Sequence, residues 1–168
     1  MDTLVLGLGN DLCGDDGVGI AAANRLKTEV SHFVDIATSS ESGLALLDYL
    51  LGYSRVIIID AIQTSQNEPG TVTELTLDDL RQVINPSPHY TGLPEMQKLS
   101  QELHFDFPSE IKIFAIEISE KYEINESLSQ QVSAAIDNVV SKIKSLLVDW
   151  RFDDKSKIPI PNISLSND

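Results

Sequence analysis

Residues 3–19, TLVLGLGNDLCGDDGVG, constrain the fold more than any other stretch of the chain. The short apolar run at residues 4–6 ends at a glycine, which is typical of a strand buried on both faces of a parallel sheet. The glycines that follow allow the backbone to turn tightly. Asp15 and Asp16 then precede a helical pattern, so two acids fall at the carboxyl end of a strand, where open α/β sheets bind their ligands.

The same motif has simpler explanations. A dinucleotide-binding fingerprint requires a third glycine in G-x-G-x-x-G, but Leu12 occupies that position, and the acid pair would repel a pyrophosphate. Acids at the start of a helix can also complement the helix dipole. We favour this structural explanation for Asp15, whereas Asp16 remains a candidate functional residue.

Strand and helix patterns alternate along the rest of the chain. Residues 55–60, RVIIID, contain a run of β-branched side chains that predicts a central, fully buried strand. Further strands are expected near 33–37, 71–75 (an edge strand) and 111–118, and helices over 18–30, 44–51, 78–84 and 94–103. Ser127 and Gln130 form a capping-box pattern, which predicts the start of a last helix that ends near Trp150.

This alternation predicts a single three-layer α/β domain over residues 1–150. Its mostly parallel central sheet should have about five strands, with helices on both faces. Residues 151–168 contain two prolines and show no apolar period, so we expect them to form a poorly ordered C-terminal tail.

The composition disfavours several classes of function. The chain has 168 residues, with 12 Lys and Arg against 26 Asp and Glu, and its net charge of −14 disfavours nucleic-acid and anionic-membrane partners. No apolar run is long enough to span a bilayer, and no secretory signal precedes the first strand. The single cysteine, Cys13, fits a reducing compartment. We therefore expect a cytoplasmic protein, and we expect it to be a monomer.

Three side chains could converge at one edge of the sheet. Asp16 follows the first strand and Asp60 ends the central one, and the carboxyl ends of parallel strands share an edge. His89 lies in the proline-stiffened loop PSPHYTGL. Two carboxylates and an imidazole suit a first-row divalent metal with open coordination positions. No functional role is assigned to three other residues of similar chemistry, which are His32, His104 and Cys13.

The segments GLGNDLCGDDGVG, VIIIDAI and PSPHYTGL resemble the three signature segments of the NiFe-hydrogenase maturation endopeptidases, and the resemblance covers about residues 4–147. It implies an endopeptidase, a hydrolase, that removes the C-terminal peptide of a nickel-loaded hydrogenase large-subunit precursor. The family's metal-binding and catalytic residues correspond to Asp16, Asp60 and His89. The resemblance also implies that nickel is carried by the precursor and serves as the recognition element, and that zinc or cadmium could replace it in vitro.

One segment departs from the family pattern. Residues 38–43, TSSESG, stand where many relatives have a Gly-Gly-Thr type of turn, and Glu41 could approach the same edge as Asp16.

Two other functions are compatible with parts of the sequence. A receiver-like signalling module would be phosphorylated at Asp60, but this hypothesis leaves the Gly-x-Gly-Asn turn and His89 unexplained. A non-catalytic relative could bind a metalloprotein precursor without cutting it.

Overall fold

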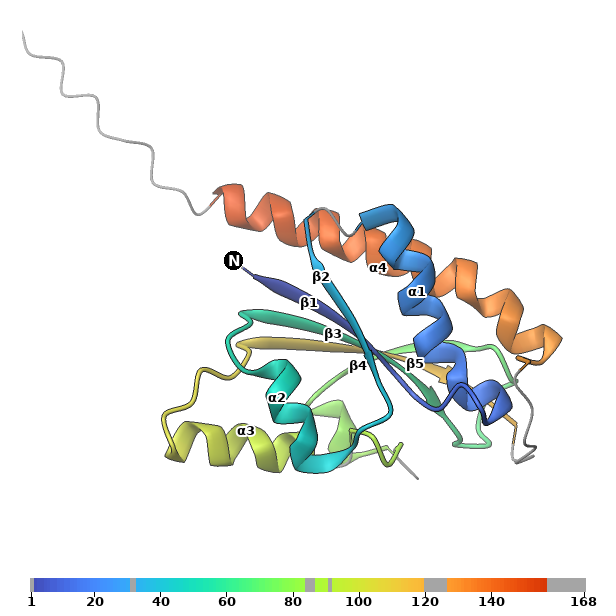
Figure 1. Ribbon diagram of the computed structural model, residues 1–168, viewed down its shortest axis with the longest axis horizontal. Coiled ribbons are helices and arrows are strands. Elements are labelled where there is room, and N and C mark those ends of the chain that lie inside the picture. The colour runs from blue at the N-terminus through green and yellow to red at the C-terminus, as the bar shows by residue number, and fades with distance from the viewer. Residues whose placement is uncertain (1, 31–32, 84–86, 91, 120–126, 157–168) are drawn as a thin grey trace, which may run out of the picture.

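The computed structural model describes residues 2–30, 33–83, 87–90, 92–119 and 127–156 (Figure 1). Its strands form one five-stranded sheet in the order β2-β1-β3-β5-β4. The parallel strands are β1 (Thr3–Leu8), β2 (Asp35–Ser39), β3 (Arg55–Ile62) and β5 (Glu110–Glu117). β4 (Val72–Thr76) pairs antiparallel with β5 at one edge. The prediction of a single, mostly parallel α/β domain is therefore confirmed.

Helices cover both faces of the sheet. α1 (Val18–Val30) and α4 (Gln130–Ser156) pack on one face, whereas α2 (Leu47–Leu50) and α3 (Leu93–Glu102) lie on the other (Figure 1). Side chains alternate between the two faces along a strand, so β3 contributes to both cores and all of its residues are buried. This explains why residues 56–59 of β3 form a continuous apolar run.

Two elements differ from the expected helices and strands in the first half of the chain. β2 covers Asp35–Ser39 instead of residues 33–37, because its register is set by pairing with β1, and Phe33 is exposed. The segment predicted as a helix over 44–51 begins with a 3₁₀ turn, η2 (Gly43–Leu46), before α2 starts.

The segment predicted as a helix over 78–84 forms only the 3₁₀ turn η3 (Asp79–Arg81) among its described residues, and Ile84 lies outside them. The helix predicted from Pro94 is confirmed as α3, which follows Gly92 in the left-handed conformation. Within the described ranges, no helix is both long and apolar enough to cross a membrane.

The last helix differs from its prediction at both ends. Its N-terminal cap is Ser129, whose hydroxyl accepts the N–H of Val132 at 3.4 Å, so the capping box predicted at Ser127 and Gln130 is wrong. α4 also continues past Trp150 to Ser156, and residues 157–168 lie outside the described residues.

Tertiary contacts hold Trp150 on the sheet, within α4. The Arg55 guanidinium donates to the Trp150 carbonyl oxygen at 3.1 Å and lies 5.3 Å from the centre of the indole ring. The indole N–H in turn donates to Glu110 at 3.2 Å. These contacts dock the end of the helix on the sheet, whereas the sequence pattern reports only apolar periodicity.

Candidate active site

The carboxyl end of β1 is built from glycines that bring two backbone segments into direct contact. A Cβ atom on Gly9, which has φ +135°, would lie 2.0 Å from the carbonyl oxygen of Asp16. A Cβ atom on Gly19 would lie 2.3 Å from the carbonyl oxygen of Ile59. Only glycine allows this approach, so η1 (Gly14–Gly17), which carries Asp16, lies directly against the ends of β1 and β3.

Asp60 lies near the end of β3 and is completely buried. One carboxylate oxygen accepts the N–H of Ala61 at 2.8 Å, and the other accepts the hydroxyl of Ser87 at 2.5 Å. Burial raises the pKa of Asp60 to about 7, although the neighbouring His89 and the Ser87 hydrogen bond act in the opposite direction. Asp60 can therefore gain or lose a proton near neutral pH.

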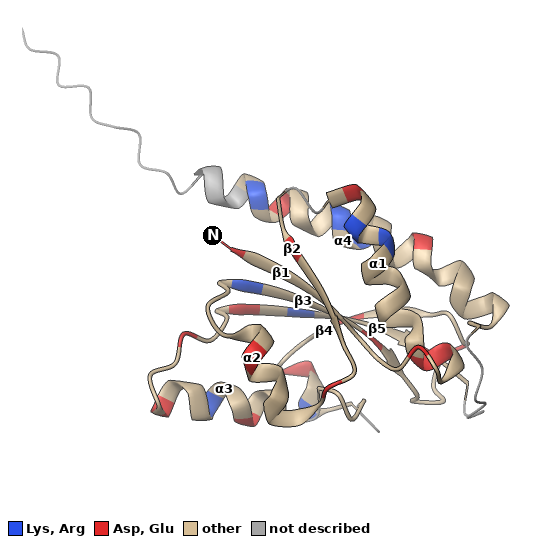
Figure 2. Ribbon diagram, viewed as in Figure 1, with Lys and Arg blue, Asp and Glu red and all other residues tan. Residues whose placement is uncertain are grey.

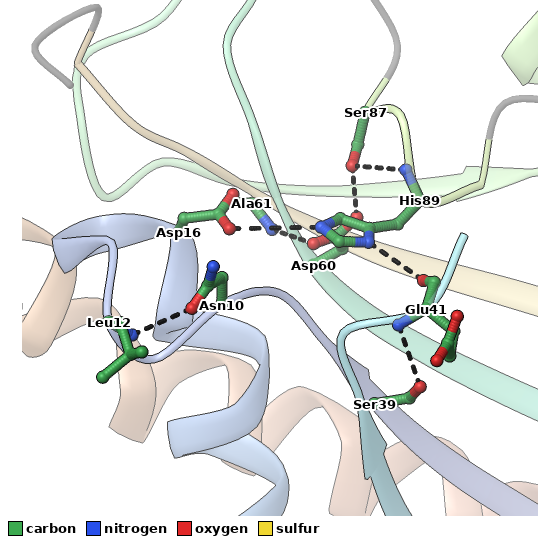
Figure 3. Close-up of polar contacts among 9 residues, drawn as sticks. All are labelled: Asn10, Leu12, Asp16, Ser39, Glu41, Asp60, Ala61, Ser87 and His89. Carbon is green, nitrogen blue, oxygen red and sulfur yellow. Dashed lines mark hydrogen bonds and ion pairs between the residues drawn. The ribbon is translucent and has the colours of Figure 1, made fainter.

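The imidazole ring of His89 lies between the backbone carbonyl of Glu41 and the carboxylate of Asp16 (Figure 3). Nδ1 lies 3.1 Å from the backbone carbonyl oxygen of Glu41, and Nε2 lies 4.0 Å from a carboxylate oxygen of Asp16. A carbonyl oxygen can only accept, so this contact assigns the proton to Nδ1 and leaves the Nε2 lone pair facing Asp16 when the ring is neutral. A nitrogen lone pair and a carboxylate that face each other can together bind a cation or share a proton.

The loop that carries His89 is also connected to Asp60. The backbone N–H of His89 donates to the hydroxyl oxygen of Ser87 at 3.3 Å, and the same hydroxyl donates to Asp60. The side chains of His89 and Asp16 keep 14% and 20% of their surface exposed, whereas Asp60 forms the floor. The structure therefore brings Asp16, Asp60 and His89 together at one edge, and the side chains of Asp16 and His89 are reachable from outside.

The three side chains do not form a closed metal cage. Among the described residues, no group of three or more His, Cys, Asp or Glu side chains is close enough to hold a metal ion. Two ligands at about 2.1 Å from one ion lie roughly 3–3.5 Å apart, which is shorter than the 4.0 Å between His89 and Asp16. The chemistry of the donor set suits a borderline divalent ion, and a small side-chain movement would bring these two donors together.

Sequence reasoning missed two of the groups that orient this site. Ser87 lies two residues before His89, so its closeness to the site was visible in the sequence, but its hydrogen bond to Asp60 was not. Glu41 was predicted only as a residue that could approach the same edge as Asp16, and the group that contacts His89 is its backbone carbonyl. A main-chain group leaves no mark in the sequence, so nothing there could have identified it.

Several other titratable residues lie outside the candidate site, and two of them form hydrogen bonds that hold the backbone in place. Asp15 accepts the N–H of Ser129 at 2.6 Å, so it lies at the N-terminus of α4 rather than serving only the helix that follows it. Glu117, at the end of β5, accepts the N–H groups of Thr64 and Ser65 at 2.7 and 2.8 Å. His104 is exposed and has positive φ, while His32 lies outside the described residues.

Residues 21–146 match the family model of the hydrogenase maturation proteases (HycI), which is more than half of the chain. The chain belongs to the hydrogenase maturation protease family, and its role is that of a maturation endopeptidase. The matched range contains Asp60 and His89 but begins after Asp16.

Individual relatives agree with this assignment. The hydrogenase 2 maturation protease of Escherichia coli K12 is 28% identical over 88% of this chain and 91% of the relative. The hydrogenase expression/formation protein HoxM of Cupriavidus necator is 26% identical over 88% of this chain and 74% of the relative. The structure of the E. coli hydrogenase maturating endopeptidase HybD superimposes with a TM-score of 0.76 and 27% identity, covering 89% of this chain and 93% of HybD.

The family assignment removes the receiver-like hypothesis. Receiver domains have parallel strands in the order 2-1-3-4-5, whereas here β5 lies between β3 and an antiparallel β4. The resemblance seen in the three sequence segments is confirmed at the level of family and fold.

Proposed function

We propose that this protein removes the C-terminal peptide from the nickel-loaded precursor of a NiFe-hydrogenase large subunit. In this proposal, Asp16, Asp60 and His89 supply protein ligands to the nickel ion that the precursor carries. Nickel is then part of the substrate and identifies a precursor that is ready to be cut. The partner is the precursor itself, and the protease needs no metal of its own.

One observation carries the proposal: His89 presents Nε2 to the carboxylate of Asp16 while its Nδ1–H is held by the Glu41 carbonyl. Histidine ligands in metal sites are oriented in the same way, by a hydrogen bond from the second ring nitrogen to a carbonyl or carboxylate. The open spacing of the donors suits an ion that arrives with other ligands already attached. Such an ion polarises a nearby carbonyl group and lowers the pKa of bound water.

Asp60 has a second property that fits this role. Its pKa of about 7 means that binding of a cation can displace its proton under mild conditions. The carboxylate orientation is already fixed by Ser87 and Ala61, so it need not reorganise when the ion arrives.

The test is to incubate the protein with nickel-loaded precursor and to follow the precursor's mass. Asp16→Asn, Asp60→Asn and His89→Ala should each stop the loss of the C-terminal peptide, whereas His104→Ala should not. Calorimetric titration of the isolated variants with nickel, zinc or cadmium should show binding weakened by roughly tenfold or more in the first three variants only. If His89→Ala cleaves at the normal rate, the three-ligand site is wrong. If the wild-type protein binds the precursor without cutting it, the protein is a non-catalytic binding relative.

A further inference from the structure

An apolar groove lies between η2 and α3. The groove has a volume of about 380 Å³ and is lined by Gly43, Leu44, Gly92, Glu95, Met96 and Leu99. Leu44 is 64% exposed and Leu99 is 38% exposed, which is high for large apolar side chains. Exposed leucines that line a concave surface are typical of a binding site rather than of ordinary surface.

The groove is connected to the candidate active site through two loops. The hydrogen bond between the Glu41 carbonyl and His89 joins the loop that leads into η2 to the loop that leads into α3. Gly43 lies two residues after Glu41, and Gly92 lies three residues after His89. Two residues that line the groove therefore belong to the segments that follow Glu41 and His89, which places one end of the groove on the same side as the candidate active site.

The charges at this edge select a basic partner. The loops after β1, β2 and β3 (residues 9–17, 40–43 and 63–71) contain acids, and neither these loops nor the His89 loop (residues 87–92) contain lysine or arginine. Acidic residues mark the same edge in Figure 2, where η1 follows β1. Glu95 is the charged residue in the groove lining, and it is exposed. A second copy of this chain would bring the same acidic loops and would be repelled.

We infer that this groove is a docking site for the hydrogenase large-subunit precursor, and that it takes an apolar side chain next to a lysine or arginine of the precursor that pairs with Glu95. The inference rests on the proposed function for the identity of the partner. Met96 forms the floor, and its flexible thioether can adapt to the shape of the bound side chain. The groove then holds the precursor while the residues around His89 meet the metal.

The experiment compares two groove variants with two matched controls in cleavage of nickel-loaded precursor. Leu44→Asp and Glu95→Lys change the groove. Val148→Asp changes an exposed apolar residue on α4, and Glu102→Lys reverses a charge at the far end of α3. Both groove variants should raise KM by roughly tenfold or more with kcat within about twofold of wild type, as expected for loss of an interface anchor. Both controls should stay within about twofold in both constants.

Two further measurements separate this inference from the proposed function. Cadmium titration of Leu44→Asp should give wild-type affinity, because the metal ligands are unchanged. Asp60→Asn should lose cleavage but still bind the precursor, and adding Leu44→Asp to it should weaken that binding by roughly tenfold. Suppose that wild type does not cleave the precursor, but that Asp60→Asn with Leu44→Asp still binds it more weakly than Asp60→Asn alone. The proposed function then fails and the docking site stands.

The inference is overturned if Leu44→Asp cleaves and binds like Val148→Asp. It is also overturned if sedimentation shows that wild type self-associates through the groove and that Leu44→Asp abolishes the association. Circular dichroism melting of all variants establishes that each is folded, which is expected because the four substituted side chains are exposed.

Discussion

The Nδ1 atom of His89 lies 3.1 Å from the backbone carbonyl oxygen of Glu41, so a main-chain group decides which imidazole nitrogen faces Asp16. The carbonyl is itself held in place, because the N–H of Glu41 donates to the Ser39 hydroxyl at 3.0 Å. The loop at residues 38–43 therefore orients His89 through a backbone contact.

Glu41→Ala should leave metal binding within about twofold of wild type, because it keeps the carbonyl that contacts His89. Ser39→Ala removes the hydrogen bond that positions Glu41, which is worth ~1 kcal/mol, and should weaken metal binding several-fold. Cadmium titration of both variants tests this. A large loss in Glu41→Ala alone would mean that the carboxylate is itself a ligand.

Ser87→Ala should destabilise the protein by roughly 1–3 kcal/mol at pH 8, because buried Asp60 would lose a charge-assisted hydrogen bond. The pKa of Asp60 should also rise, since the Ser87 hydrogen bond lowers it. Ser100→Ala is the matched control: the Ser100 hydroxyl is buried and has no hydrogen-bond partner among the described residues. Urea unfolding should show little or no loss for Ser100→Ala, and equal losses in the two variants would contradict the prediction.

Asp60 should make the stability of the protein depend on pH. Its pKa is raised from 3.8 to about 7 in the folded state, so between these values the folded protein binds a proton that the unfolded chain has lost. The free energy of unfolding should therefore fall as pH rises from about 4 to 7 and should level off above that range. Relative to Asp60→Asn, the change should be on the order of 4 kcal/mol, at 1.36 kcal/mol per pKa unit. Parallel stability curves for the two proteins would show that Asp60 is ionised throughout.

Glu117→Ala should unfold the loop after β3 locally, because the N–H groups of Thr64 and Ser65 would lose their acceptor. The expected loss of stability is roughly 1–3 kcal/mol. Glu117→Gln should cost less, because the amide oxygen can accept both N–H groups and the Thr64 hydroxyl can turn to accept from the amide. Hydrogen exchange at Thr64 and Ser65 measures this directly, and equal exchange in both variants would show that charge matters more than hydrogen bonding.

The parts of the fold that the sequence predicted are those that depend on local pattern. β3 was visible because a strand buried on both faces must be apolar throughout, and α3 was visible from Pro94 and the apolar period that follows. β2 was displaced because its ends depend on pairing with β1. The end of α4 was missed because the apolar period stops near Trp150 whereas the helix continues to Ser156.

In the candidate site, too, some features could be predicted from the sequence and others depend on tertiary packing. Asp16 and Asp60 were found because parallel strands bring their carboxyl ends to one edge, and His89 was found from its stiff loop and from the family resemblance. The fully buried state of Asp60 and the hydrogen bonds around His89 could not be predicted, because both depend on how three separate loops pack together. That packing is a tertiary property with no local sequence signal.

The hydrogen bond from Ser129 to Asp15 has a consequence for biosynthesis. Asp15 and its neighbour Asp16 leave the ribosome before Ser129 and the helix it begins. Until α4 docks beside α1, the loop that carries Asp16 lacks this anchor. A nascent chain therefore completes this corner of the site only after α4 has been made and has docked, so the segment that carries Asp16 depends on a helix more than 100 residues further along the chain.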